Sequence, residues 1–206
     1  MGKSTLKTWK KLQSEGYFEN HPLYDCQTIG IPHCVDIKDI SGKTVIDFGC
    51  GYGRDTKFFR KFANHVFAVD VSEEILVKAY NFVYNGEDIL PVDFVLAEDL
   101  DCIQNTSVDY VYALHVFQHL SPEQAEEYIK VFHNKLVLDG RLMIQFYLGK
   151  DKMMDEGKEP RVQYTTEEAY KLFKSAGFKI DRTWVLQKMD AKEHLQYEHL
   201  YIVGRK

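Results

Sequence analysis

From residue 44 onward, two hydrophobic patterns take turns along the chain. Short apolar runs, typical of buried strands, are followed by stretches with apolar residues at helical spacing, typical of amphipathic helices. The predicted strands are 44–48, 65–71, 93–97, 108–114, 141–148, 179–188 and 199–206. The predicted helices are 54–63, 72–86, 121–136 and 165–178, with Ser72 and Ser121 as N-caps and Gly177 as a stop. Strands that alternate with helices indicate a parallel sheet with crossover helices.

The last two predicted strands, 179–188 and 199–206, are separated by a polar segment too short to hold a crossover helix. One of these strands must therefore run antiparallel to the sheet. The pattern predicts an α/β fold with a Rossmann-like, doubly wound sheet of seven strands, mostly parallel with one antiparallel C-terminal strand.

The first 40 residues follow a different pattern. A helix is predicted from Ser4 to about Gly16, and proline and glycine interrupt the segment after it. Its aromatic residues either close over a ligand site as a lid that excludes water or anchor the terminal helix to the sheet. These residues are Trp9, Tyr17, Phe18 and Tyr24. We therefore divide the single domain into an N-terminal helix and lid segment, 1–40, and a ligand-binding part, 41–206.

Composition narrows the classes of partner. The 206 residues carry a net charge of −5, which disfavours a broad basic surface for nucleic acid or anionic membranes. No apolar run approaches the roughly 18 residues of a membrane helix, and the N-terminus lacks a signal-peptide pattern. The four cysteines show neither metal-pair spacing nor a disulfide framework. We expect a cytoplasmic protein without a membrane partner, and the sequence gives no indication of its oligomeric state.

The stretch TVIDFGCGYGRD, residues 44–55, places three alternate glycines directly after the first predicted strand. Glycines allow a sharp turn and a close approach of the backbone to a ligand. Their G-x-G-x-G spacing differs from the G-x-G-x-x-G of dinucleotide binders. Asp47 suits a cationic or amine-bearing ligand better than a pyrophosphate, and Asp70, ending the second strand, suits the hydroxyls of a ribose. The loop therefore predicts a nucleoside with a positively charged tail and no phosphates.

These motifs resemble those of the class I S-adenosylmethionine-dependent methyltransferases, from about Ser41 to the C-terminus. VIDFGCGYGRD resembles the first motif, FAVDVSEEIL the second, LAEDLD the segment after the third strand and VDYVYALHVFQHL the fourth motif. The resemblance implies S-adenosyl-L-methionine as cofactor and S-adenosyl-L-homocysteine as its product. The cofactor-binding residues that it implies are Asp47, Gly49, Cys50, Gly51, Gly53, Arg54, Asp70, Val71, Glu98, Asp99 and Leu114.

The adenine-binding acid is ambiguous in this chain. The family has an Asp after the third strand, where this chain reads Leu96-Ala97-Glu98-Asp99. If the segment after the third strand is one residue shorter here than in the family, Glu98 is the adenine partner and Asp99 the alternative. A solvated pair of loop acids is the third interpretation.

The fourth motif departs from a subgroup in which Glu-x-x-Glu-His helps to hold a divalent metal. This chain reads His115-Val-Phe-Gln118-His119, which lacks the carboxylate ligands that Mg²⁺ prefers. His115 and His119, four residues apart, could share a helix face for a softer metal. The alternative, which we adopt, is that His115 faces the acceptor, His119 orients the loop backbone and no metal is bound.

Methyl transfer from a sulfonium requires mainly the alignment of acceptor, methyl and sulfur. A hydroxyl acceptor also needs a base for its proton, and an imidazole is suitable at neutral pH. The catalytic candidates are His115, then His119, then Tyr147 at the end of the fifth strand. Tyr147 could instead be an aromatic wall, and a neutral amine acceptor needs no base. Lys150, Lys152 and Arg161, in the polar segment 149–163, could meet an anionic acceptor.

We expect a methyltransferase that acts on an O or N atom of a small-molecule acceptor. Nucleic-acid N-methyltransferases of this fold often carry Asn/Asp-Pro-Pro-aromatic after the fourth strand, where this chain has Ala113–Val116. The alternatives are a protein or RNA methyltransferase and a non-catalytic S-adenosylmethionine-binding partner module. A fourth class, an NAD-dependent dehydrogenase, is opposed by the glycine spacing and Asp47.

Overall fold

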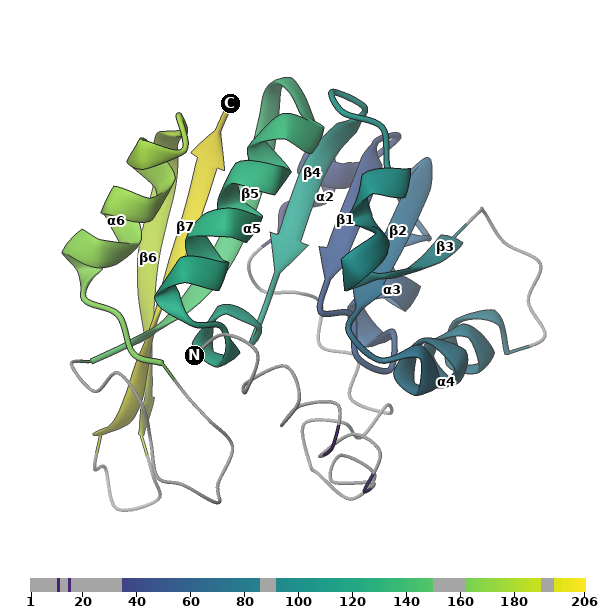
Figure 1. Ribbon diagram of the computed structural model, residues 1–206, viewed down its shortest axis with the longest axis horizontal. Helices are drawn as coiled ribbons and strands as arrows, with labels where there is room; N and C mark the ends of the chain where they lie inside the picture. The colour runs from purple at the N-terminus through teal and green to yellow at the C-terminus, as the bar shows by residue number, and fades with distance from the viewer. Residues whose placement is uncertain (1–10, 12–14, 16–34, 86–91, 150–161, 190–194) are drawn as a thin grey trace.

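The computed structural model describes residues 11, 15, 35–85, 92–149, 162–189 and 195–206. Within them a single sheet carries helices on both faces (Figure 1). Apart from Lys11 and Glu15, the predicted helix from Ser4 and the four aromatic residues of the lid segment lie outside the described residues, so the division at residue 40 stays a prediction. No helix in the described parts is long and apolar enough to cross a membrane.

The sheet has the order β3-β2-β1-β4-β5-β7-β6. Its strands are β1 Thr44–Phe48, β2 His65–Asp70, β3 Val92–Leu96, β4 Val108–Ala113, β5 Leu136–Leu148, β6 Lys179–Met189 and β7 Leu195–Arg205. β7 runs antiparallel to both β5 and β6, and the other pairs are parallel. In Figure 1 the arrow of β7 accordingly points opposite to that of β4. This arrangement confirms the predicted fold class.

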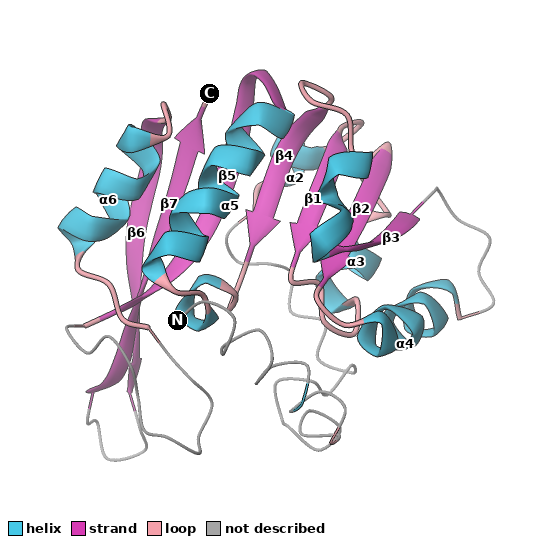
Figure 2. Ribbon diagram, in the orientation of Figure 1, coloured by secondary structure: helices cyan, strands magenta, loops and turns pink. Residues whose placement is uncertain are grey.

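Two apolar clusters hold the helices against the two faces of the sheet. The helices are α2 Ile37–Ile40, α3 Arg54–Phe59, α4 Glu73–Tyr84, α5 Pro122–Lys135 and α6 Thr166–Ser175, with short 3-10 helices η2 Ala97–Cys102 and η3 Phe117–His119. Buried side chains of α5 and α6, such as Phe132 and Phe173, share one cluster. Side chains of α2, α3 and α4, such as Ile40, Phe59 and Val83, share the other. Figure 2 shows α5 and α6 in front of the sheet, with α2 and α3 behind it.

Local sequence signals set the helix ends. The hydroxyl of Ser72 accepts from the Ile75 N–H, and Ser121 forms a capping box with Gln124, as their N-cap residue types predict. Thr165 forms a second capping box with Glu168 at the start of α6. Gly177, with φ of 96°, follows the last turn of α6, where the stop was predicted.

Three boundaries differ from the prediction by four residues or more, one of them the start of β7, which lies at Leu195 rather than at 199. α3 ends at Phe59, four residues early, because Phe62 and Ala63 both donate to the Phe59 carbonyl in a turn. β5 begins at Leu136 rather than at 141, because Leu136 pairs with Val108 before a bulge that precedes Arg141. These differences depend on backbone hydrogen bonds and strand pairing, which the spacing of apolar residues along the segment does not reveal.

Candidate active site

The carboxyl ends of the parallel strands meet at one edge of the sheet, where ligands bind in open α/β folds. The glycine loop follows β1, Asp70 ends β2, η2 follows β3, and His115 follows β4. The structure therefore gathers the residues singled out from the sequence at one edge, apart from those that lie outside the described segments.

The glycine loop packs too tightly for side chains at two of its glycines. Gly49 has φ of 75°, and a Cβ there would overlap the side chain of Val116. Gly53 has φ of 82°, and a Cβ there would lie 2.7 Å from Cγ2 of Val83 on α4. Both positions therefore require glycine for their conformation and for space. The N–H of Gly49 donates to the Val69 carbonyl at 2.7 Å, which ties the loop to the end of β2.

Asp70 joins the second strand to the loop. Its Oδ2 accepts from the Gly51 N–H at 3.0 Å, and its Oδ1 accepts from the Val71 N–H at 2.8 Å. Because backbone amides hold both oxygens, the carboxylate has a defined position beside the loop. Val71, which the resemblance places at the cofactor, is half-buried directly after it.

Asp47 lies on β1 at the base of the loop and is 2% exposed. Its Oδ2 accepts from the Thr56 hydroxyl at 2.5 Å. Burial, reinforced by the neighbouring carboxylate of Asp55, raises the pKa of Asp47 to about 8. A cation brought to this carboxyl would lower its pKa, since it favours the charged form.

Two other residues that the resemblance places at the cofactor are Arg54 and Cys50. Arg54 donates from Nε to Oδ1 of Asp55 at 3.0 Å, and Tyr112 on β4 donates its hydroxyl to Oδ2 of Asp55 at 3.0 Å. Asp55 was not singled out in the sequence, since its partner Tyr112 lies far along the chain. Cys50 is buried, and burial raises the pKa of its thiol, so it is held as a neutral side chain.

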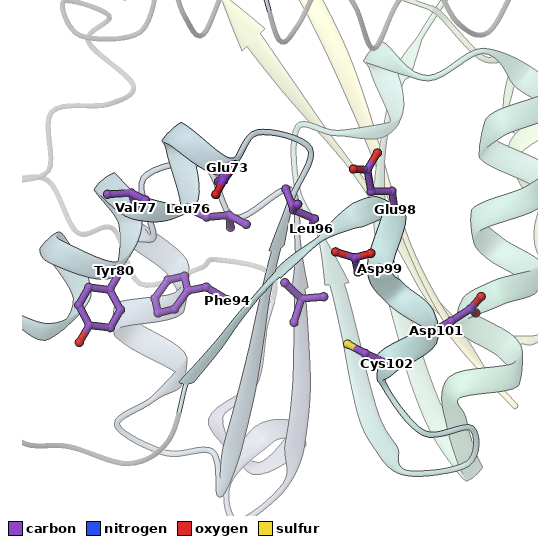
Figure 3. A pocket seen from close by; sticks show the side chains of 11 residues that line it. Glu73, Leu76, Val77, Tyr80, Phe94, Leu96, Glu98, Asp99, Asp101 and Cys102 are labelled. Atoms are coloured by element: carbon purple, nitrogen blue, oxygen red, sulfur yellow. The ribbon is translucent and has the colours of Figure 1, made fainter.

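The third strand leads to the two candidate adenine acids. Glu98 and Asp99 are both exposed on η2 and line a cavity of about 850 Å³ together with Leu76 and Leu96. Figure 3 shows their carboxylates pointing in different directions, that of Asp99 toward β3. Leu114, half-buried after β4, packs against the apolar cluster of α3 and α4.

The acceptor candidates His115 and Tyr147 are joined by a histidine that sequence reasoning missed. The ring of His199, on β7, lies 5.5 Å from the ring of His115 and 5.5 Å from that of Tyr147, between ring centroids. Tyr147 and His199 are register partners in the antiparallel pair of β5 and β7. Only that register, which no local pattern reveals, could have identified His199.

The backbone of His115 is held in an uncommon conformation. His115 has φ of 59°, and its N–H donates to Oε1 of Gln145 at 2.9 Å. Gln145, buried on β5, donates from Nε2 to the Tyr201 hydroxyl at 3.3 Å. Gln145 thus connects β5, β7 and the loop after β4.

Comparison with known proteins assigns this site to a family. A family model described as a methyltransferase domain matches residues 45–140, from β1 to the start of β5. The segment contains the glycine loop, Asp70, η2 and His115. Residues 45–140 are therefore similar to this methyltransferase domain, and the sheet order is that of a Rossmann-like methyltransferase fold.

Solved structures share the fold of this chain over nearly its full length. The 1,6-didemethyltoxoflavin-N1-methyltransferase of Burkholderia thailandensis has a TM-score of 0.72 and 20% identity, covering 100% of this chain and 90% of that one. The magnesium protoporphyrin IX methyltransferase of Synechocystis has a TM-score of 0.71 and 18% identity, covering 98% of this chain and 99% of that one.

Sequence relatives cover a shorter stretch. Phosphoethanolamine N-methyltransferase 1 of Triticum aestivum is 33% identical over 92 residues, which are 43% of this chain and 18% of the relative. The matched stretch is about a fifth of the length of the curated relatives.

The two histidines of the fourth motif lie in different environments. His119 is buried on η3 with its Nε2 3.0 Å from Nε2 of Gln118. His115 precedes η3 with a left-handed backbone, so the two do not share one helix face. Within the described segments no three His, Cys, Asp or Glu residues gather closely enough to hold a metal ion. The basic candidates Lys150, Lys152 and Arg161 lie outside those segments.

Proposed function

We propose that this chain binds S-adenosyl-L-methionine along the glycine loop and transfers its methyl group to an O or N atom of a small-molecule acceptor. The observation that carries the proposal is the position of Asp70, whose carboxylate is hydrogen-bonded to Gly51 inside the loop. An acid fixed there at the end of β2 can accept hydrogen bonds from the two hydroxyls of a ribose.

The surrounding residues fit the other parts of that cofactor. Asp47, buried with a raised pKa, suits the ammonium group of the methionine moiety. Gly49 and Gly53 fix the tight conformation of the loop that would carry the cofactor. Glu98 is our choice for the adenine amine, with Asp99 as the alternative, and Val71 and Leu114 offer apolar surface to the base.

His115 and Tyr147 are the proposed acceptor-side residues. The bound cofactor supplies a methyl group on a positively charged sulfur, and the protein aligns the acceptor for in-line displacement. His115 would accept the proton of a hydroxyl acceptor, while an amine acceptor would require only alignment. His119 is the second candidate for the base. The contacts of His199 with both His115 and Tyr147 support a common acceptor wall.

The named substrates of the relatives support a small-molecule acceptor. They include phosphoethanolamine, a toxoflavin precursor and magnesium protoporphyrin IX, which differ widely in size and charge. Their variety supports the class of acceptor without favouring one compound.

Calorimetric titration with S-adenosylmethionine, S-adenosylhomocysteine and NAD tests the cofactor assignment. We expect micromolar binding of both sulfur compounds, loss of binding in Asp70→Ala, and unchanged binding in Glu126→Ala on the exposed surface of α5. Binding of NAD alone would contradict the proposal. Formation of S-adenosylhomocysteine in the presence of phosphoethanolamine, as the first of a series of small acceptors, then tests the transfer step.

A further inference from the structure

Strand β3 forms one end of the sheet, and β2 is the only described strand that pairs with it. A free strand edge presents backbone N–H and C=O groups that can pair with another chain. The cavity of about 850 Å³ runs along this edge between α4 and η2 (Figure 3).

Tyr84 on α4 shows which backbone groups of β3 face outward. Its hydroxyl accepts from the N–H of Val92 at 3.2 Å and donates to the Val92 carbonyl at 3.4 Å. In an extended strand the N–H and C=O of alternate residues point to the same edge. Phe94 and Leu96 therefore direct their backbone groups to the same side as Val92, beside the cavity.

The two sides of the cavity differ in chemistry. On the α4 side, Val77 and Tyr80 are 56% and 52% exposed, and the Tyr80 ring lies 5.7 Å from that of Phe94. On the η2 side, the exposed carboxylate of Asp99 points toward β3 (Figure 3). Asp93 adds a second exposed acid on the strand itself, with its Oδ2 3.1 Å from Nε2 of His65 on β2. The cavity thus joins exposed apolar and aromatic surface to exposed carboxylates.

We propose that the β3 edge binds an extended segment of a partner protein in which apolar residues alternate with lysine or arginine. Such a segment would add a strand to the sheet through the backbone groups of Phe94 and Leu96. Because side chains alternate between the two faces of a strand, one set would cover Val77 and Tyr80. The other set would meet Asp93 and Asp99.

Charge disfavours a second copy of this chain as the occupant. Pairing two β3 edges would bring Asp93 and Asp99 of one copy near the same residues of the other, and like charges across strands are destabilising. The lysine or arginine side chains of a basic segment would instead form ion pairs with these carboxylates. The proposal goes beyond methyl transfer and does not require a bound cofactor, although Glu98 and Asp99 at one end of the cavity are also the two candidates for the adenine amine.

A labelled eight-residue peptide of alternating valine and lysine is a suitable probe, with binding followed by fluorescence anisotropy. We expect Tyr80→Asp and Asp99→Lys each to weaken binding about tenfold or more. The control Glu167→Lys, at an exposed position on α6, should bind as the wild type does. Val77→Asp provides a second variant of the apolar side, and thermal unfolding checks that each variant is folded.

Two N-methylated peptides separate strand addition from simple charge attraction. Methylation of the valine amides or of the lysine amides blocks opposite edges of the peptide, so one form should bind and the other should not. Equal binding of both forms, or of a peptide with glutamate in place of lysine, would overturn the proposal. A dimer of the chain that Tyr80→Asp dissociates would overturn it as well, because a second copy would then be the occupant.

Discussion

Asp47 is the residue whose protonation should respond most directly to the cofactor. It is buried beside two other carboxylates, those of Asp55 and Asp70, and its pKa in the cofactor-free protein is raised to about 8. An ammonium group bound next to Asp47 would lower this pKa, since it favours the charged carboxylate. Binding near neutral pH should therefore release a proton from Asp47.

The sign of the pH dependence follows from that release. The affinity for S-adenosylhomocysteine should rise with pH up to about pH 8 and then level off, with a limiting slope of about tenfold per pH unit for one proton. Calorimetry in buffers of different ionisation enthalpy measures the proton directly. Asp47→Asn should bind more weakly and release none. Binding by the wild type without proton release would contradict the assignment of Asp47.

Gln145 determines how three elements meet at the acceptor side. Its side chain accepts from the N–H of His115 after β4 and donates to Tyr201 on β7. Gln145→Met has similar length but removes both hydrogen bonds, so we expect the free energy of unfolding to fall by about 1–3 kcal/mol. Urea unfolding measures the change. A fall of less than about 0.5 kcal/mol would argue against this role.

The helices and strands differ in how far local sequence determines them. Ser72 and Ser121 cap helices because their side chains bond to amides three residues away, which a short segment reveals. β5 begins earlier than its apolar pattern indicates, because Leu136 pairs with Val108 on β4. Side-chain contacts between segments far apart in the sequence, such as that of Tyr112 on β4 with Asp55 on α3, have no local signal at all.

For the molecule as a whole, the cofactor side was more predictable than the acceptor side. Asp47 and Asp70 lie at or near strand ends and the glycines follow one, so a short sequence motif places them at one edge of the sheet. The acceptor wall depends on β7 returning antiparallel beside β5, which alone brings His199 to Tyr147. The acceptor therefore depends on residues that only the folded sheet brings together. The cofactor could be predicted from the glycine loop in the sequence.

Cofactor binding should stabilise the entire domain, because the loop, β2 and η2 contribute to one site only in the folded chain. At about 100 times its Kd, S-adenosylhomocysteine should add ~2.7 kcal/mol to the free energy of unfolding. For a domain of this size that is a rise in Tm of about 5–11 °C. Thermal unfolding with and without the ligand measures the rise, and Asp70→Ala should abolish it. A rise that persists in Asp70→Ala would mean that the ligand binds elsewhere on the molecule.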